Sequence, residues 1–113
     1  MNLEIELYTK ERGNSPIISF IEKLPISAKA KTIETFELLS KYGTLLGMPY
    51  VKSVTGVRQL WELRIKSDTN IYRYFFFIKN GKIIVILHAY QKKSSGIPKN
   101  DLKIVKHRLK EML

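Results

Sequence analysis

The sequence contains no cysteine, and this absence excludes both a disulfide-bonded scaffold and a thiol nucleophile. It also has no apolar run of about 18 residues, the length that a transmembrane helix needs, so we expect no membrane partner. The first ten residues lack the basic stretch followed by a long apolar stretch that marks a signal peptide. Together these absences favour a cytoplasmic protein.

Residues for cofactor or metal chemistry are also scarce. None of the six glycines belongs to a glycine-rich phosphate-binding loop. The acidic residues and the two histidines show neither a paired-carboxylate pattern nor the spacing of metal ligands. We therefore expect no cofactor and no metal.

Acidic residues are few, with 10 Asp and Glu against 20 Lys and Arg, a formal net charge of +10 and a pI near 9.9. Such a surplus of positive charge favours a polyanionic partner. An anionic membrane surface fits less well, because no segment pairs a bulky apolar face with a basic back. An acidic protein partner, or a basic composition without a binding role, stays open.

The residues that are present indicate one folded domain over residues 1–113. Hydrophobic residues make up 44% of the chain and aromatic residues 11%, enough for a core without disulfides. Alternating apolar and polar residues predict a strand over 3–8. Ser15-Pro16 predicts the cap and first turn of a helix that stops at Pro25, and Ser27 predicts the cap of a second helix that runs to Tyr42.

Further elements follow. In the second helix, Ile33, Phe36 and Leu39 form the expected buried stripe, and Gly43 is a natural C-terminal stop. Residues 43–58 predict a loop with a short strand over 50–54. Three strands are expected over 59–66, 70–79 and 82–90, and a last helix from Asn100. The pattern is that of an α+β fold.

The register of the last two strands decides where the polar residues lie. Asn80-Gly81 predicts a two-residue hairpin turn, because both central residues of such a turn take a positive φ. This turn would put Arg73 opposite His88, with Tyr90 two residues further along the same face.

The preceding hairpin adds a second arginine. A loop over 67–70 would pair Arg64 with Arg73 and bring Lys66 to the same face. Two adjacent arginines repel each other unless an anion lies between them, and Glu62 on that face offsets part of the repulsion. The opposite face is apolar and is expected to hold the two N-terminal helices, through Trp61, Leu63, Ile65, Tyr72, Tyr74, Phe76, Val85, Leu87 and Ala89. The C-terminal helix is expected over the apolar end of the first face, formed by Leu60, Phe75, Phe77, Ile84 and Ile86.

Several short motifs, in this order, resemble the HigB/RelE-type toxins of bacterial type II toxin–antitoxin systems, and more narrowly the phage-derived-protein-like branch of HigB. They are Trp61-Glu62-Leu63-Arg64, Tyr72-Arg73 before further aromatic residues, the strand 84–90 that ends in His88-Ala89-Tyr90, and Lys92-Lys93 followed by Pro98. The resemblance covers nearly the whole chain. One departure is the loop that reads KKSSGIP, where the family typically has KKTxKTP.

The resemblance implies a RelE-like fold, with a twisted, mainly antiparallel sheet, an N-terminal helical hairpin on one face and a C-terminal helix. It also implies a metal-independent endoribonuclease that cuts mRNA, usually within the ribosome, and so inhibits translation and growth. The implied partners are mRNA, the ribosome and a cognate antitoxin of the helix-turn-helix class.

Metal-independent RNA cleavage needs cations for the phosphorane charge, a base for the 2′-hydroxyl and an acid for the 5′-oxygen. We expect Arg64 and Arg73 to bind the phosphate, because a guanidinium stays charged and donates two hydrogen bonds at once. Lys92 or Lys93 is expected to act as general base or by its charge, since neighbouring cations lower the pKa of a lysine.

A second group of residues is expected to bind the substrate. Tyr90 would stack on a base or donate a proton, and His88 would serve as an acid. Lys52, Lys66 and Lys99 would contact the RNA backbone.

Each assignment has an ordinary structural alternative. Arg64 and Arg73 could form a solvated sheet face, and His88 and Tyr90 could be packing residues. For the whole chain, a non-catalytic nucleic-acid-binding module and a protein-interaction domain remain the competing hypotheses.

Overall fold

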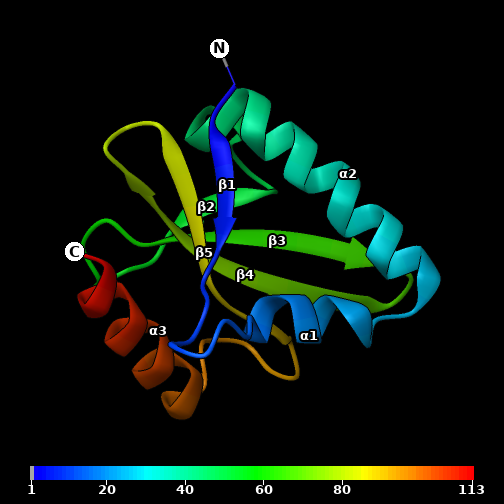
Figure 1. Ribbon diagram of the computed structural model, residues 1–113. Helices are drawn as coiled ribbons and strands as arrows, with labels where there is room; N and C mark the ends of the chain where they lie inside the picture. The colour runs from blue at the N-terminus through cyan, green and yellow to red at the C-terminus, as the bar shows by residue number, and fades with distance from the viewer. Residues whose placement is uncertain (1) are drawn as a thin grey trace.

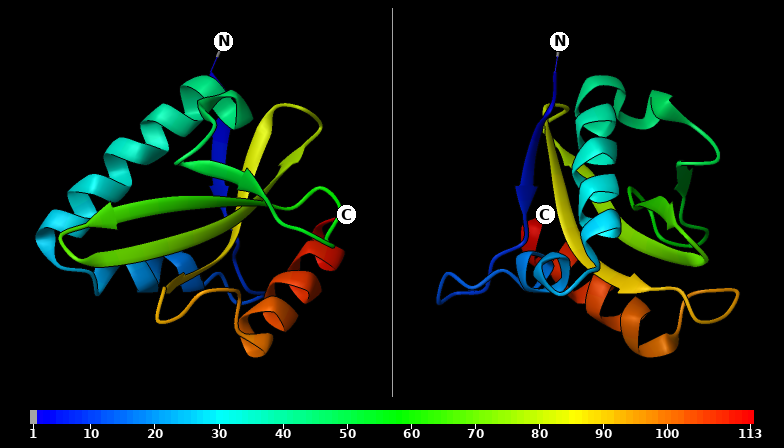
Figure 2. Two further views of the ribbon diagram at one scale, coloured as in Figure 1. Left: turned by 180° about the vertical axis from the view of Figure 1, so that it is seen from behind. Right: turned by 90° about the vertical axis from the view of Figure 1, so that its right-hand side faces the viewer.

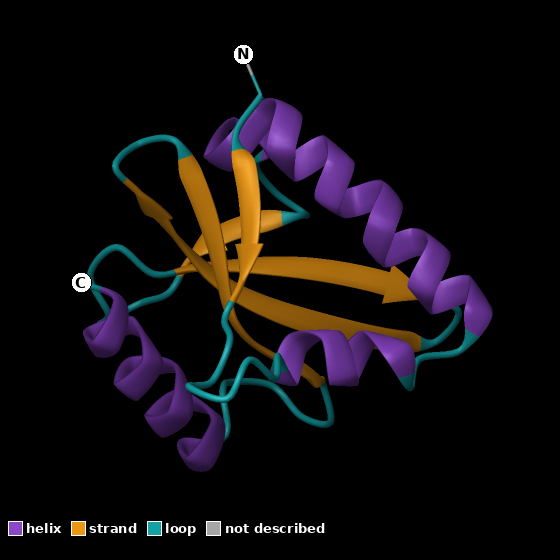
Figure 3. Ribbon diagram, viewed as in Figure 1, coloured by secondary structure: helices purple, strands orange, loops and turns teal. Residues whose placement is uncertain are grey.

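A five-stranded sheet of order β1-β5-β4-β3-β2 forms the centre of the structure, a computed structural model that describes residues 2–113 (Figures 1 and 3). The elements are β1 (Glu4–Leu7), α1 (Pro16–Glu22), α2 (Ile26–Tyr42), the 3₁₀ turn η1 (Gly43–Leu46), β2 (Val51–Ser53), β3 (Trp61–Ser67), β4 (Asn70–Lys79), β5 (Ile83–Gln91) and α3 (Lys99–Met112). Among the strand pairs of residues 2–113, only β1–β5 is parallel. The predicted α+β class with a mainly antiparallel sheet is confirmed, and the arrangement is compatible with a RelE-like fold.

The helical hairpin packs on the aromatic face of the sheet, as predicted. The ring of Phe20 on α1 meets Tyr72 and Tyr74 edge to face, and the hydroxyls of Thr32 on α2 and Tyr74 lie 3.0 Å apart. Seen from behind, β3 faces the viewer with no helix in front of it (Figure 2). Within residues 2–113, the face of β3 that is turned away from the helical hairpin therefore carries no helix.

The predicted helix boundaries are largely confirmed. Ser15 caps α1 by accepting a hydrogen bond from the amide of Ile18, and α2 ends before Gly43, whose φ is 57°. The second helix begins at Ile26, one residue before the predicted cap at Ser27. The last helix begins at Lys99, one residue before Asn100.

The predicted buried stripe of α2 is partly wrong, because Ile33 is 57% exposed. Thr32 and Thr35 are buried instead, along with Leu39. Both threonines bury their hydroxyls at low cost, since Thr32 pairs with Tyr74 and the Thr35 hydroxyl donates to the carbonyl of Lys31.

The β3–β4 register is as predicted, with Arg64 opposite Arg73. The β4–β5 register is not, because Arg73 pairs with Tyr90 rather than with His88. The turn has three residues (80–82), with Lys79 opposite Ile83, and a bulge at Leu87 adds a further residue to β5.

These two insertions shift the register by two residues at Arg73, so that His88 and Tyr90 keep their predicted face. Between turn and bulge the shift is one residue, which places Ile84 and Ile86 on the face opposite to the predicted one.

α3 lies across β5 at the other end of the molecule from α2 (Figure 1). Val105 and Leu109 are its buried residues. Within residues 2–113, no helix has the length and apolar character needed to cross a bilayer.

Candidate functional site

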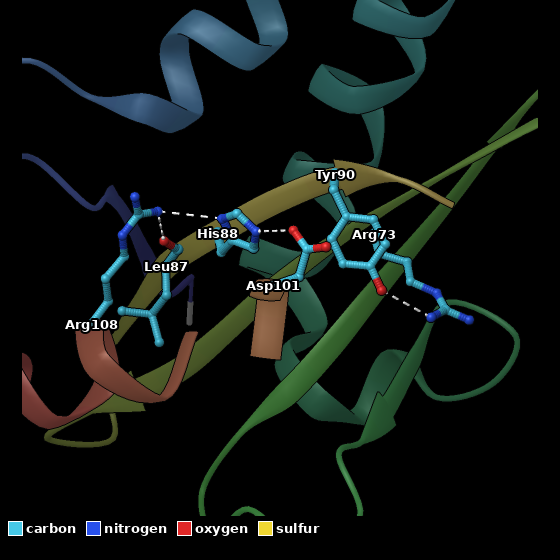
Figure 4. Close-up of polar contacts among 6 residues, drawn as sticks. All are labelled: Arg73, Leu87, His88, Tyr90, Asp101 and Arg108. Carbon is cyan, nitrogen blue, oxygen red and sulfur yellow. Dashed lines mark hydrogen bonds and ion pairs between the residues drawn. The ribbon is translucent and has the colours of Figure 1, made fainter. Parts of the chain in front are cut away.

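Arg73 lies on β4, on the sheet face opposite the helical hairpin, and it is almost buried, with 7% of its surface exposed. Its Nη1 donates hydrogen bonds to the hydroxyl of Tyr90 (3.1 Å) and to the carbonyl of Gly96 (2.9 Å). Figure 4 shows the guanidinium reaching the phenol of the neighbouring strand. Arg73 therefore ties β5 and the 92–98 loop to β4.

The charge of Arg73 is balanced by Glu62, as expected from the shared face. Nε of Arg73 lies 3.2 Å from Oε1 of Glu62, and the two side chains are 9% and 8% exposed. The contact is an ion pair without good hydrogen-bond geometry, since the buried Nε has no hydrogen-bond partner. Glu62 is positioned for this by β2–β3 pairing, which sets it opposite Lys52.

Tyr90 is held on two sides. Its ring stacks on Phe75 at a centroid distance of 5.7 Å, and its hydroxyl accepts the hydrogen bond from Arg73. Burial raises the pKa of Tyr90 above its ordinary value of 10.0, although Arg73 acts in the opposite direction. The phenol is thus protonated at neutral pH, and its own proton is free to be donated.

Lys92 follows β5 and is fixed through its amide, which donates to the carbonyl of Ile71 at 2.7 Å. Desolvation lowers the pKa of Lys92 below 10.5, and the charges of Arg64, Arg73 and Lys52 lower it further. These four residues, Lys52, Arg64, Arg73 and Lys92, are called the cationic cluster below. Apart from Arg73, none of them makes an ion pair with another described residue.

A cleft of about 320 Å³ opens beside the cluster. It is lined by Lys52, Glu62 and Arg73, by Gly96 and Ile97 of the 92–98 loop, by residues 53–55 at and just after the end of β2, and by Leu102 of α3. The cleft brings together the uncovered sheet face, the edge strand β2 and the loop that Arg73 holds.

His88 is engaged elsewhere (Figure 4). Its Nε2 donates to Oδ1 of Asp101 at 2.7 Å, and its Nδ1 lies 3.4 Å from Nη1 of Arg108. Burial lowers the pKa of His88 below 6.5 despite the opposing effect of Asp101. This neutral, doubly held imidazole joins β5 to α3, and the sequence carried no signal for its partner Asp101, 13 residues away.

The other predicted residues lie further out. Lys66 is exposed on β3 and shares a second cleft with Arg64. Lys93 is exposed in the loop after β5, and Lys99 is the exposed first residue of α3. The structure therefore gathers Lys52, Arg64, Arg73, Tyr90 and Lys92 into one site, with Lys66 at its margin.

This site can bind an anion at Arg64, Lys52 and Lys92, and it offers a protonated phenol within the same cluster. Such an arrangement suits a phosphodiester, whose charge grows in the transition state of its cleavage. Among residues 2–113, no group of three or more His, Cys, Asp or Glu side chains could hold a metal ion.

Comparison with known proteins adds one match. Residues 19–110 match the protein family described as phage derived protein Gp49-like (DUF891). The match runs from within α1 to within α3 and therefore includes every residue of the site. No curated protein matches the chain.

Proposed function

We propose that this chain, which belongs to the Gp49-like phage-derived protein family (DUF891) of RelE/HigB-like toxin–antitoxin toxins, is an endoribonuclease that cleaves mRNA. The cleavage would depend on the ribosome and would stop translation and growth. A helix-turn-helix antitoxin would neutralise it in the cytoplasm. Among these toxins, the sequence motifs favour the HigB branch.

The observation that carries the proposal is the cationic cluster around Tyr90, on the sheet face opposite the helical hairpin and beside α3. Three of its four cations have no carboxylate partner in the described part of the chain. Their mutual repulsion costs stability in the free protein, and a bound phosphate would remove that cost. A protonated phenol and a lysine of lowered pKa stand next to that phosphate position.

In the proposed reaction, the deprotonated form of Lys92, which the neighbouring cations favour by lowering its pKa, takes the proton of the 2′-hydroxyl, and the 2′-oxygen attacks the phosphorus. Arg64 stabilises the added charge on the phosphorane. Lys52 binds the adjoining RNA backbone, and Lys93 and Lys99 bind phosphates further along it. Tyr90 gives its proton to the leaving 5′-oxygen. The products are a 2′,3′-cyclic phosphate and a 5′-hydroxyl.

Arg73 has a different part in this scheme, because its Nη1 is already used by Tyr90 and Gly96. It contributes charge and orients the phenol rather than clasping the phosphate alone. His88 supports α3 through Asp101 and does not act as the acid.

The test compares wild type with Arg64→Ala and Lys92→Ala, since both side chains reach solvent more than Arg73 does. Lys41, an exposed lysine in the last turn of α2, provides a matched control, Lys41→Ala. Each protein is induced in bacteria while growth is followed and mRNA 5′ ends are mapped. Arrest with new in-frame ends for wild type and Lys41→Ala, but not for the other two, supports the proposal. Folded wild type without arrest or new ends contradicts it.

A non-catalytic nucleic-acid-binding module is the second candidate. It is favoured by the engagement of Arg73 and His88 in intramolecular contacts, which leaves fewer groups for chemistry. For a binder, Arg64→Ala would lower only RNA affinity and reduce the salt slope by about 0.7 to 1, the share of one phosphate contact. A nuclease would lose cleavage far beyond that loss of affinity.

A further inference from the structure

A second cleft, of about 610 Å³, shares Arg64 with the cationic cluster. It is lined by Lys31, Pro49, Tyr50, Arg64, Lys66, Asp68 and Ile71. Lys31 belongs to α2, and the others come from the segment before β2 and from the β3–β4 hairpin. An RNA strand bound at the cluster would therefore reach this cleft through Arg64.

The cleft offers an aromatic side chain to solvent. Tyr50 is 39% exposed, although its backbone is fixed because its carbonyl accepts a hydrogen bond from the Arg64 amide at 2.8 Å. Pro49 and Ile71 add apolar surface. Single-stranded RNA is read by unstacked bases that lie on such aromatic rings.

Asp68 gives the cleft a carboxylate. It lies in the turn between β3 and β4 with φ of 54°, and it is exposed. Neither Arg64 nor Lys66 forms an ion pair with it, as judged from the described residues. A carboxylate beside an RNA backbone is repulsive unless it accepts hydrogen bonds from a base.

Guanine suits such a carboxylate best. Its Watson–Crick edge carries two neighbouring donors, N1–H and the N2 amino group, which two carboxylate oxygens can accept together. Cytosine and adenine offer one donor group beside an acceptor, and uracil offers one donor between two carbonyls. The cleft thus combines a stacking ring, a base-edge acceptor and the cationic side chains of Lys31, Arg64 and Lys66.

We infer that this cleft is a nucleobase site that prefers guanine, with Tyr50 stacking on the base and Asp68 accepting from its edge. Arg64 and Lys66 bind the phosphates on either side. This inference rests on the proposed RNA substrate and adds the residues that choose the position on it. An acidic protein segment fits less well, because Asp68 would repel it and the walls of the cleft are partly apolar.

The experiment uses fluorescence anisotropy with labelled, noncleavable 2′-O-methyl RNA pentamers, AAGAA and AAAAA. The proteins are wild type, Tyr50→Ala, Tyr50→Phe and Asp68→Asn, with Tyr42→Ala as the control at an exposed tyrosine outside the cleft. Asparagine tolerates the positive φ of position 68, so that substitution preserves the turn.

Wild type is expected to bind AAGAA more tightly than AAAAA. Tyr50→Ala should weaken both by about 5-fold or more, the effect of about 1 kcal/mol of lost stacking, whereas Tyr50→Phe and Tyr42→Ala should not. Asp68→Asn should remove the difference between the pentamers and leave AAAAA binding in place.

Two results would overturn the inference alone. The first is RNA binding that Arg64→Ala weakens while Tyr50→Ala and Asp68→Asn leave it unchanged. The second is that Tyr50→Ala weakens the binding of a hexaglutamate peptide but leaves RNA binding unchanged. That result would make the cleft a peptide site. Absence of binding to both pentamers by folded wild type would also overturn the inference, whereas the proposed function fails only if growth arrest and new mRNA 5′ ends are absent. If Tyr50→Ala does not fold, the affinities of wild type and Asp68→Asn for AAGAA and AAAAA decide the question. Loss of the guanine preference in Asp68→Asn supports the inference, and its retention contradicts it.

Discussion

The buried ion pair between Glu62 and Arg73 supports a quantitative prediction about stability. Replacing Glu62 by Gln keeps the shape of the side chain but leaves the Arg73 guanidinium buried without a countercharge. Removing one partner of a buried pair costs about 3–5 kcal/mol. Because the glutamine retains hydrogen-bonding atoms, we expect the lower end, about 3 kcal/mol, within a total stability of about 5–15 kcal/mol.

Urea denaturation measures the effect. With a slope of about 1.5 kcal/mol per molar for a chain of this size, the midpoint should fall by about 2 M. Glu34→Gln is the matched control, since Glu34 lies exposed on α2, and its midpoint should stay where it is. The double variant Glu62→Gln/Arg73→Met removes both charges and should be less destabilised than the sum of the two single variants.

RNA affinity should move in the opposite direction. Glu62 is the carboxylate that faces the cationic cluster, so its neutralisation raises the positive potential there. The folded Glu62→Gln protein should therefore bind RNA more tightly than wild type at low salt. A change in unfolding free energy below about 0.5 kcal/mol, the size of an ordinary surface substitution, would refute the reasoning that Arg73 depends on this countercharge.

Four further predictions concern other groups. Burial lowers the pKa of His88 below 6.5 in the folded protein, so the unfolded chain binds the proton more readily. The stability that the neutral imidazole contributes is therefore complete above pH 6.5 and is lost as the pH falls through the pKa of the folded state. The urea midpoint of wild type should consequently fall between pH 7 and 5 more than that of His88→Gln. Asp101→Asn should lower the pKa of His88 further, which an NMR titration of the imidazole would detect, and an unchanged pKa would contradict the contact at Nε2. Since the pKa of Lys92 is lowered, the cleavage rate should level off with rising pH below 10.5, and Lys92→Arg should keep RNA affinity but lose cleavage, because arginine does not deprotonate. Gly43→Ala should destabilise the fold by about 1–2 kcal/mol in urea, because φ is +57° there and the new Cβ would lie 3.0 Å from Leu3 Cδ1; an unchanged midpoint would show that the junction of α2 and η1 relaxes freely.

Local signals in the sequence determined most of the elements. Ser15-Pro16 and Gly43 mark helix ends because capping and positive φ depend on residues next to one another. Strand alternation placed Arg64, Arg73 and Tyr90 on one face, since alternation is a property of each strand by itself. The expectation that Glu62 shares that face followed from the same rule and is confirmed.

Tertiary structure decided what those residues touch. The three-residue turn and the bulge at Leu87 depend on how β5 packs between β1 and β4, so Tyr90 rather than His88 came to lie opposite Arg73. The exposure of Ile33 depends on Tyr74, which offers a hydroxyl to Thr32 across 42 residues of sequence. Neither a pattern within one strand nor one within one helix contains that information.

The candidate site divides in the same way. Its positive charge and its aromatic residues were evident from the sequence alone, because composition and spacing are local. The burial of Arg73, the capture of His88 by Asp101 and the meeting of Tyr50 with the β3–β4 hairpin were not. Each of these arises where chain segments distant in sequence exclude water from one polar group and supply its partner, and only the folded chain brings them within hydrogen-bonding distance.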